Sequence, residues 1–144
     1  MSKFLRQWAK VEEELNEALR KAVVESAMRT YGEIVDRTPV GRPELWTSTP
    51  PEGYVPGDLH QAWEISFGKG FKKVRAKRNY KSKLANFAAA TSYRLGDTIW
   101  VRNRLPYAYR VEYGWSQQAP QGMMRTSVQK YKIFLDEAVR RNEK

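Results

Sequence analysis

The sequence predicts an α+β domain in which a small antiparallel β-sheet packs with a long N-terminal helix and a C-terminal helix. Apolar residues recur every three or four positions from about Ser2 to Asp36 and again from Met124 to Ala138, as they do on the buried face of an amphipathic helix. Between these stretches, residues 64–67 alternate polar and apolar side chains, and residues 98–101 are rich in β-branched and aromatic side chains. We therefore expect a single domain over residues 1–144.

The N-terminal helix is predicted over residues 1–36, with Ser2 placed to cap it. A continuous helix of this length extends for about 50 Å, whereas a compact domain with the length of the whole chain has a radius of gyration of about 15 Å. We therefore expect the helix to project from the domain, to break, or to pack on a neighbouring subunit.

Residues 38–57 hold five of the seven prolines, which excludes a continuous helix or a central strand. The segment also carries Trp46 and Tyr54. Two interpretations stay open at this point. The segment is either an arm whose aromatic side chains anchor on a partner, or a loop that packs back on its own domain.

Residues 58–120 form the predicted sheet region. A turn and a short helical entry lead into the first strand, and a short helix is expected from Leu84 to about Tyr93, where four alanines lie. Residues 107–113 fit either a strand or a helical turn. The closing helix is predicted over residues 121–142.

The charge of the chain is unevenly divided. Residues 1–68 carry 8 basic and 11 acidic side chains, whereas residues 69–144 carry 18 basic and 5 acidic ones. The segment 69–83 has no acidic residue, and Phe71 and Tyr80 lie among its cations. This pattern fits a solvated hairpin, or a contact with DNA phosphates or an acidic protein. The candidate contacts are Lys72, Lys73, Arg75, Lys77, Arg78, Lys81 and Lys83.

The inventory of reactive side chains argues against an enzyme. The chain has no cysteine and one histidine, His60, so thiolate chemistry and sites with several His or Cys metal ligands are excluded. No phosphate-binding glycine motif is present. We expect no catalytic residue, no metal and no cofactor. The apolar runs are also too short for a membrane span, so we expect a soluble protein made inside the cell, without membrane contact.

Two stretches of the sequence resemble a known family. The first comprises Asp36–Gly41 with Gly57–Trp63, and the second comprises Gly96–Asn103, Leu105–Ala108, Glu112–Gly114 and Trp115–Met123. Together they resemble the neck, or tail-completion, proteins of long-tailed bacteriophages, which include minor tail protein Z. The specific part is the pattern Asn-x-x-Pro-Tyr-Ala followed by Glu-Tyr-Gly, which starts at Asn103 and ends at Gly114.

The resemblance implies a structural virion protein whose copies form a ring at the head–tail junction. Such a ring joins the portal side to the tail while genomic DNA passes through its centre, and it assembles in the host cytoplasm. The implied partners are further copies of the chain, portal or adaptor proteins, and tail-terminator or tail-tube proteins. The predicted interface residues are Trp46, Tyr54, Tyr107, Glu112, Tyr113, Gly114, Trp115 and Pro120. Glu112 is expected to pair with Arg110 or with a neighbouring subunit.

Two alternatives stay open. A tail-terminator ring protein is also a small α+β ring former, and the sequence does not separate it from a neck protein. A standalone nucleic-acid-binding module would use the basic segment 69–83, with phosphate contacts from its cations and base stacking on its aromatic side chains.

Overall fold

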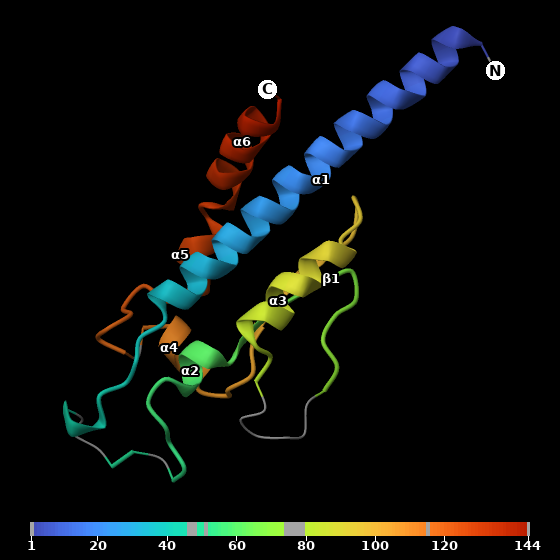
Figure 1. Cartoon of the computed structure of the whole chain (residues 1–144). Coiled ribbons are helices and arrows are strands. Elements are labelled where there is room, and N and C mark those ends of the chain that lie inside the picture. Colours follow the sequence, from blue (N-terminus) through green and yellow to red (C-terminus); the bar gives the residue numbers. More distant parts are fainter. Residues whose placement is uncertain (1, 46–48, 51, 74–79, 115, 144) are drawn as a thin grey trace.

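The computed structural model describes residues 2–45, 49–50, 52–73, 80–114 and 116–143 of the chain. Its longest element is α1, Lys3–Arg37, which begins where the Leu5 N–H donates to the Ser2 hydroxyl at 3.2 Å. Figure 1 shows that the N-terminal part of α1 extends well beyond the rest of the molecule. The helix is therefore continuous and projects, which is the first of the three outcomes expected from its length.

The end of α1 is tied to the sheet through Thr38. The Thr38 hydroxyl donates to the carbonyl of Ile34 and accepts the indole N–H of Trp63, both at 2.7 Å. Pro39 follows and disfavours further helix. This buried pair fixes the start of the first strand against the last turn of α1.

The sheet has two antiparallel strands, β1 (Trp63–Phe67) and β2 (Ile99–Asn103), with Ile65 opposite Val101. The short helix α2, Asp58–Gln61, leads into β1 as the sequence predicts. Strand β1 includes the predicted segment 64–67, whereas β2 begins one residue after the start of the predicted segment 98–101 and extends two residues beyond its end. The fold class is thus α+β, with a two-stranded antiparallel sheet and terminal helices that pack together.

Side chains form hydrogen bonds with backbone groups along the edge of β1 that does not pair with β2. Asn86, which is buried, accepts the Ile65 N–H at 3.1 Å and donates to the Tyr31 hydroxyl at 3.1 Å. The Tyr31 hydroxyl in turn donates to the Trp63 carbonyl at 3.0 Å, and the Lys81 ammonium donates to the Ile65 carbonyl at 3.1 Å. Burial, with a smaller contribution from the Glu64 charge, raises the pKa of Tyr31, so its hydroxyl keeps the proton that it donates. An edge that would otherwise expose unpaired backbone groups is thereby closed.

Short helices occupy the middle of the chain. Helix α3, Lys83–Ala89, continues into the 3₁₀ turn η2, Ala90–Ser92, and so confirms the helix predicted from Leu84 to Tyr93. Helix α4, Ala108–Glu112, decides between the two interpretations of residues 107–113 in favour of a helical turn. The proline-rich segment contains the 3₁₀ turn η1, Pro43–Leu45.

The closing helix is divided into α5, Met124–Val128, and α6, Tyr131–Asn142, so the prediction of one helix over residues 121–142 was wrong at this point. Between them, the Lys130 N–H bonds to the Ser127 carbonyl three residues back, a tighter turn than an α-helix has. The Lys130 ammonium contacts the Glu33 carboxylate at 2.6 Å. After this bend α6 runs back along α1 and ends beside the middle of that helix (Figure 1).

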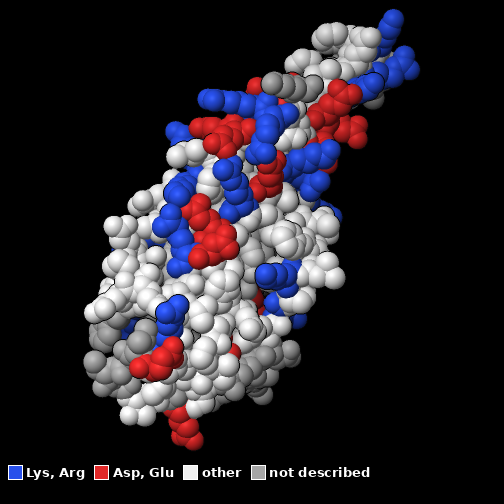
Figure 2. Space-filling view, turned by 60° about the vertical axis from the view of Figure 1, so that its left-hand side comes forward, with Lys and Arg blue, Asp and Glu red and all other residues white. Residues whose placement is uncertain are grey.

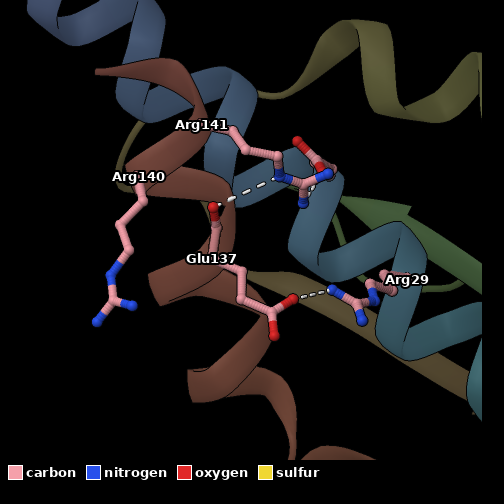
Figure 3. Close-up of a pocket in the computed structure, with 5 residues that line it drawn as sticks. Arg29, Glu137, Arg140 and Arg141 are labelled. Carbon is pink, nitrogen blue, oxygen red and sulfur yellow. Dashed lines mark hydrogen bonds and ion pairs between the residues drawn. The ribbon is translucent and has the colours of Figure 1, made fainter. Parts of the chain in front are cut away.

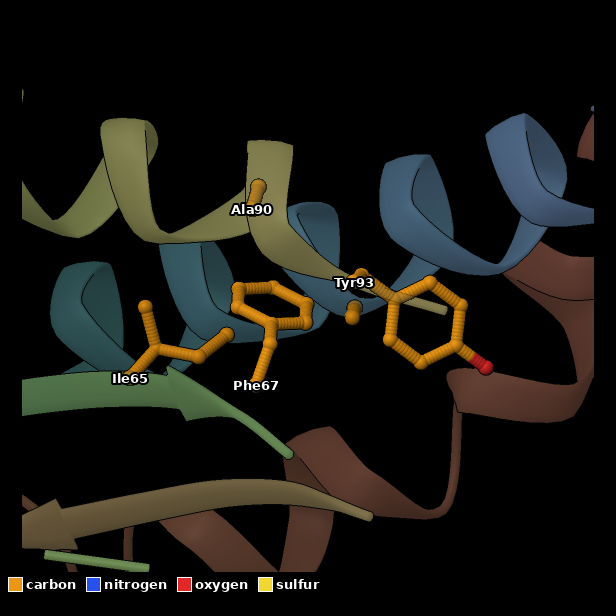
Figure 4. Close-up of a cluster of buried hydrophobic side chains, with 5 residues drawn as sticks. Ile65, Phe67, Ala90 and Tyr93 are labelled. Carbon is orange, nitrogen blue, oxygen red and sulfur yellow. The ribbon is translucent and has the colours of Figure 1, made fainter. Parts of the chain in front are cut away.

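The core consists of two clusters on the C-terminal half of α1. In the first, Ile65 and Phe67 of β1 face Ala90 and Tyr93, as Figure 4 shows, with Ala27 of α1 closing the cluster. The Phe67 and Tyr93 rings meet edge to face, with centroids 5.8 Å apart. The second cluster comprises Ile34, Leu59, Trp63, Ala119 and Met123. Among the described residues, neither cluster includes one from the first half of α1.

We predict that replacing Asn86 with alanine destabilises the protein by about 2–3 kcal/mol, because the buried Ile65 N–H loses its acceptor. Chemical denaturation measures this change. The matched control is Asn16→Ala on the exposed part of α1, where we expect a change below about 0.5 kcal/mol. Equal effects at the two positions would contradict the role of Asn86 at the sheet edge.

Candidate functional site

Glu112 connects α4 to the first turn of α5. Its Oε2 accepts the N–H groups of Met123 at 2.7 Å and Met124 at 2.8 Å, and its Oε1 accepts the N–H of Arg125 at 2.9 Å. The first N–H groups of a helix have no partner within the helix, so this carboxylate caps α5 from outside. The Arg125 guanidinium pairs with the same carboxylate at 3.1 Å. Glu112 thus forms an ion pair with Arg125, a partner that the sequence analysis did not name.

Two glycines let the loop from α4 to α5 close tightly. Gly122 has φ +84°, and a Cβ there would lie 2.4 Å from the Glu112 carbonyl oxygen. Gly114 has φ +87°, and a Cβ there would lie 2.8 Å from the Pro120 carbonyl oxygen. Of the predicted interface residues, Glu112, Gly114 and Pro120 therefore lie together and shape this loop from within. Trp115 lies outside the described residues.

The charge of Glu112 stabilises the loop. Burial would raise the pKa of its carboxyl group, but the N–H groups of Arg125, Met124 and Met123 and the Arg125 side chain together lower that pKa below its ordinary value. Only 13% of the Glu112 side chain is exposed. The folded protein therefore stabilises the ionised form of the Glu112 carboxyl group.

An exposed aromatic pair lies on α4. Tyr109 and Tyr113 are four residues apart, with ring centroids 4.6 Å from each other, and their exposed fractions are 70% and 52%. The Arg125 guanidinium lies 4.4 Å from the centre of the Tyr113 ring. The sequence analysis named Tyr113 but missed Tyr109, which the i, i+4 spacing would have indicated once residues 108–112 were assigned to a helix.

The other two predicted tyrosines contact each other. Tyr54 of the proline-rich segment lies against Tyr107, with ring centroids 6.3 Å apart. Both residues are half-buried. Burial is the main cause that raises the pKa of Tyr54. The segment thus packs back on its own domain at Tyr54, while Trp46 lies outside the described residues.

The basic segment is attached to the sheet at both of its described ends. The Arg102 guanidinium lies 4.3 Å from the centre of the Phe71 ring and donates to the Lys72 carbonyl at 3.0 Å. The Arg104 guanidinium lies 5.3 Å from the centre of the Tyr80 ring. Both aromatic side chains that we considered for base stacking therefore lie against arginines of the chain itself.

A buried carboxylate holds these two arginines in place. Glu64 of β1 is buried, and its carboxylate lies 2.8 Å from Arg102 and 3.7 Å from Arg104. A buried charge needs such partners, because an unpaired carboxylate loses its hydration without compensation. Glu64 thereby fixes the positions of the arginines and, through them, the ends of the basic segment.

The predicted polyanion contacts are in different environments. Lys72, Lys73 and Lys83 are exposed, whereas Lys81 donates to the β1 edge. Arg75, Lys77 and Arg78 lie outside the described residues. Three of the predicted contacts are therefore available at the surface for a polyanion or an acidic protein.

A hollow between α1 and α6 is lined by Glu25, Arg29, Glu137, Arg140 and Arg141. Figure 3 shows the Arg29 and Glu137 side chains pointing toward each other across it, at 2.5 Å, with Arg140 directed away. Arg141 pairs with Glu25. These ion pairs join the two helices, and every residue that lines the hollow is charged, whereas small-molecule sites are lined mainly by hydrophobic and aromatic side chains.

Neither a metal site nor a membrane span emerges from the described part of the chain. In that part no cluster of three or more histidine, aspartate and glutamate side chains is placed to hold an ion, and no helix is long and apolar enough to cross a bilayer. Searches against protein-family models, curated proteins and solved structures find no match to the chain.

We predict that Glu112→Gln destabilises the protein by about 2–3 kcal/mol at pH 7, because charge-assisted hydrogen bonds to the α5 amides are weakened. Since the folded-state pKa is lowered, this stabilisation is present above the ordinary value of 4.5 and is lost as the pH falls through the folded-state pKa. Denaturant unfolding of both proteins from pH 7 downward measures the difference.

The matched control is Glu52→Gln, because Glu52 is exposed. We expect it to change stability by less than about 0.5 kcal/mol at neutral pH. A Glu112→Gln loss that stays constant into the acid range would show that the carboxylate charge does not hold the loop.

Proposed function

We propose that the chain is a structural subunit of a tailed bacteriophage or prophage virion, and that its copies form a ring at the head–tail junction. The observation that carries the proposal is the uncovered first half of α1, a helix that projects from the domain with large apolar side chains in solvent, among them Phe4 (69% exposed) and Trp8 (62%). Contiguous exposed apolar surface of this kind is typical of a protein that contacts other proteins.

The residues that carry the family resemblance support the proposal through what they hold together. Asn103 donates to the Leu59 carbonyl at 2.8 Å and accepts the Leu105 N–H at 3.0 Å, which connects the end of β2 to α2. Glu112 and Gly114 close the following loop on α5. The residues of the motif thus hold together the end of β2, helix α2, helix α4 and the start of α5. Tyr109 and Tyr113 lie on the surface of this part of the protein.

In this proposal the mechanism is docking and involves no catalysis. The exposed part of α1 and the tyrosine pair on α4 contact adjacent subunits or neighbouring rings. The exposed lysines of the basic segment contact an acidic partner or the DNA in the channel. Tyrosine side chains suit such contacts, because they combine a large rigid apolar surface with a hydroxyl group.

The tail-terminator ring is the alternative that shares all of these features. The position of the coding region relative to those of the portal, capsid and tail-tube proteins distinguishes the two. The standalone nucleic-acid module is a weaker alternative, because Phe71 and Tyr80 lie against Arg102 and Arg104. That arrangement favours contact with phosphates over stacking of bases.

We predict that the double variant Tyr109→Ala, Tyr113→Ala folds normally but joins rings on portal or tail complexes at least about tenfold less efficiently, because exposed aromatic side chains often dominate an interface. Electron microscopy and mass measurement of the assembled complexes count the rings. The matched control, Lys132→Ala on the exposed side of α6, assembles as the native chain does. A native chain that never forms rings beside portal and tail proteins would contradict the proposed function.

We also predict that the variant Lys72→Gln, Lys73→Gln, Lys83→Gln binds duplex DNA more weakly, with a salt dependence that is reduced by about 0.9 for each phosphate that the variant no longer neutralises. Binding of short duplexes measured from low to moderate salt gives the slope. No binding of the native chain at low salt would exclude the nucleic-acid module and leave the ring proposal in place.

A further inference from the structure

The first half of α1 carries a narrow apolar stripe that stays in solvent. Its exposed large apolar side chains are Phe4, Leu5, Trp8, Val11, Leu15 and Leu19. Four of them, Phe4, Trp8, Val11 and Leu15, are separated by four, three and four residues and fall within about 60° around the helix. This is the spacing of the a and d positions of a coiled coil.

The stripe continues into the face that the domain itself covers. The next position in the same repeat after residue 18 is Ala22, which is completely buried. Helix α6 ends at Asn142, which lines a shallow hollow together with Ala18 and charged side chains of α1 between Lys10 and Lys21. On the apolar face itself Val11 and Leu15 are 57% and 58% exposed, so the face that the domain covers at Ala22 goes on uncovered toward the N-terminus.

Charges along the exposed part are separated by sign. Residues 2–10 carry three basic and no acidic side chains, and residues 11–17 carry four acidic and no basic ones. Figure 2 shows basic side chains at the far end of the projection and acidic ones next to them. Two such helices side by side place like charges together if they are parallel and opposite charges together if they are antiparallel.

We propose that a second copy of the chain covers this stripe, with the two α1 helices antiparallel over residues 3–17. In the register that pairs the apolar residues, Phe4 lies opposite Leu15 of the second copy, and Trp8 lies opposite Val11 of the second copy. This places a d residue against an a residue in every layer, as antiparallel coiled coils do. The same register brings the basic end of each helix beside the acidic stretch of the other.

The register also fits the space along α1. Ser2 of the second copy lies opposite Glu17, so the second helix ends before Ala22, where the domain itself buries this face of α1. The paired part has 15 residues, about 22 Å of helix. A helix this short is marginal on its own. Here it is the continuation of a helix that the domain already holds, so pairing requires no new folding.

The pairing is isologous, since each copy uses the same surface, and it concerns the free protein. It goes beyond the proposed ring, in which contacts run from one subunit to the next around the axis. A chain that is monomeric alone but forms rings beside portal proteins would overturn the pairing and leave the proposed function standing. A chain that dimerises but never forms rings would support the pairing and contradict the proposed function.

Sedimentation velocity of the purified chain tests the pairing. We expect a dimer at about 100 µM that dissociates on dilution. The variant Trp8→Ala, Leu15→Ala raises the dissociation constant by about a hundredfold or more, because each copy then lacks two of its four apolar side chains in the interface, so all four layers lose one. Alanine keeps the helix, and both side chains are exposed in the single chain, so circular dichroism stays unchanged.

The matched control is Leu84→Ala, Phe87→Ala on α3, since these two apolar side chains are exposed to a similar extent but lie outside the stripe. We expect the control variant to dimerise as the native chain does. A native chain that stays monomeric at all concentrations, or a control variant that dissociates as strongly as the α1 variant, overturns the proposal.

Disulfide trapping tests the antiparallel orientation. The chain has no cysteine, so single substitutions give unique thiols. Gln7 and Glu14 lie on the same flank of the stripe, and in the antiparallel register each is beside the other residue of the second copy. When the Gln7→Cys and Glu14→Cys chains are mixed and oxidised, we expect mainly the mixed disulfide. Parallel helices would put the Gln7–Glu14 flanks of the two copies on opposite sides of the pair, so failure to form the mixed disulfide overturns the antiparallel orientation.

Discussion

The second edge of β1 is the constraint on which the rest of the fold depends. A sheet of two strands leaves one edge of each strand without a partner, and it is too small to be stable alone. Here Tyr31 from α1, Asn86 from α3 and Lys81 from the end of the basic segment bond to the backbone of β1. Three segments far apart in the sequence are thereby held at fixed positions around five residues of strand.

This arrangement leaves much apolar surface outside the core. The two buried clusters lie along the second half of α1, and β1 with its short helices fills the space beside it. The first half of α1 has the same apolar spacing but no covering element among the described residues. Since exposed apolar side chains lower solubility and favour association, we interpret this part of α1 as a surface built for contact between chains.

The sequence was most informative where the signal is local. The apolar spacing predicted α1 over nearly its full length, and the β-branched run 98–101 predicted most of β2. Contacts between distant residues had no such signal. Nothing in the pattern around Glu112 indicates that its carboxylate binds amides 11–13 residues further on, and nothing around Phe71 indicates that Arg102 covers its ring. Such contacts depend on how the elements pack, which periodicity does not report.

The most direct measurement of the central claim is hydrogen exchange along α1 at two protein concentrations. The account predicts that amides of residues 3–17 exchange fast in dilute solution and become protected as the concentration rises, whereas amides of residues 22–37 stay protected at both, because the domain itself covers that half. Fast exchange of residues 3–17 at every concentration would contradict it, since no second copy would then cover the exposed half of the helix.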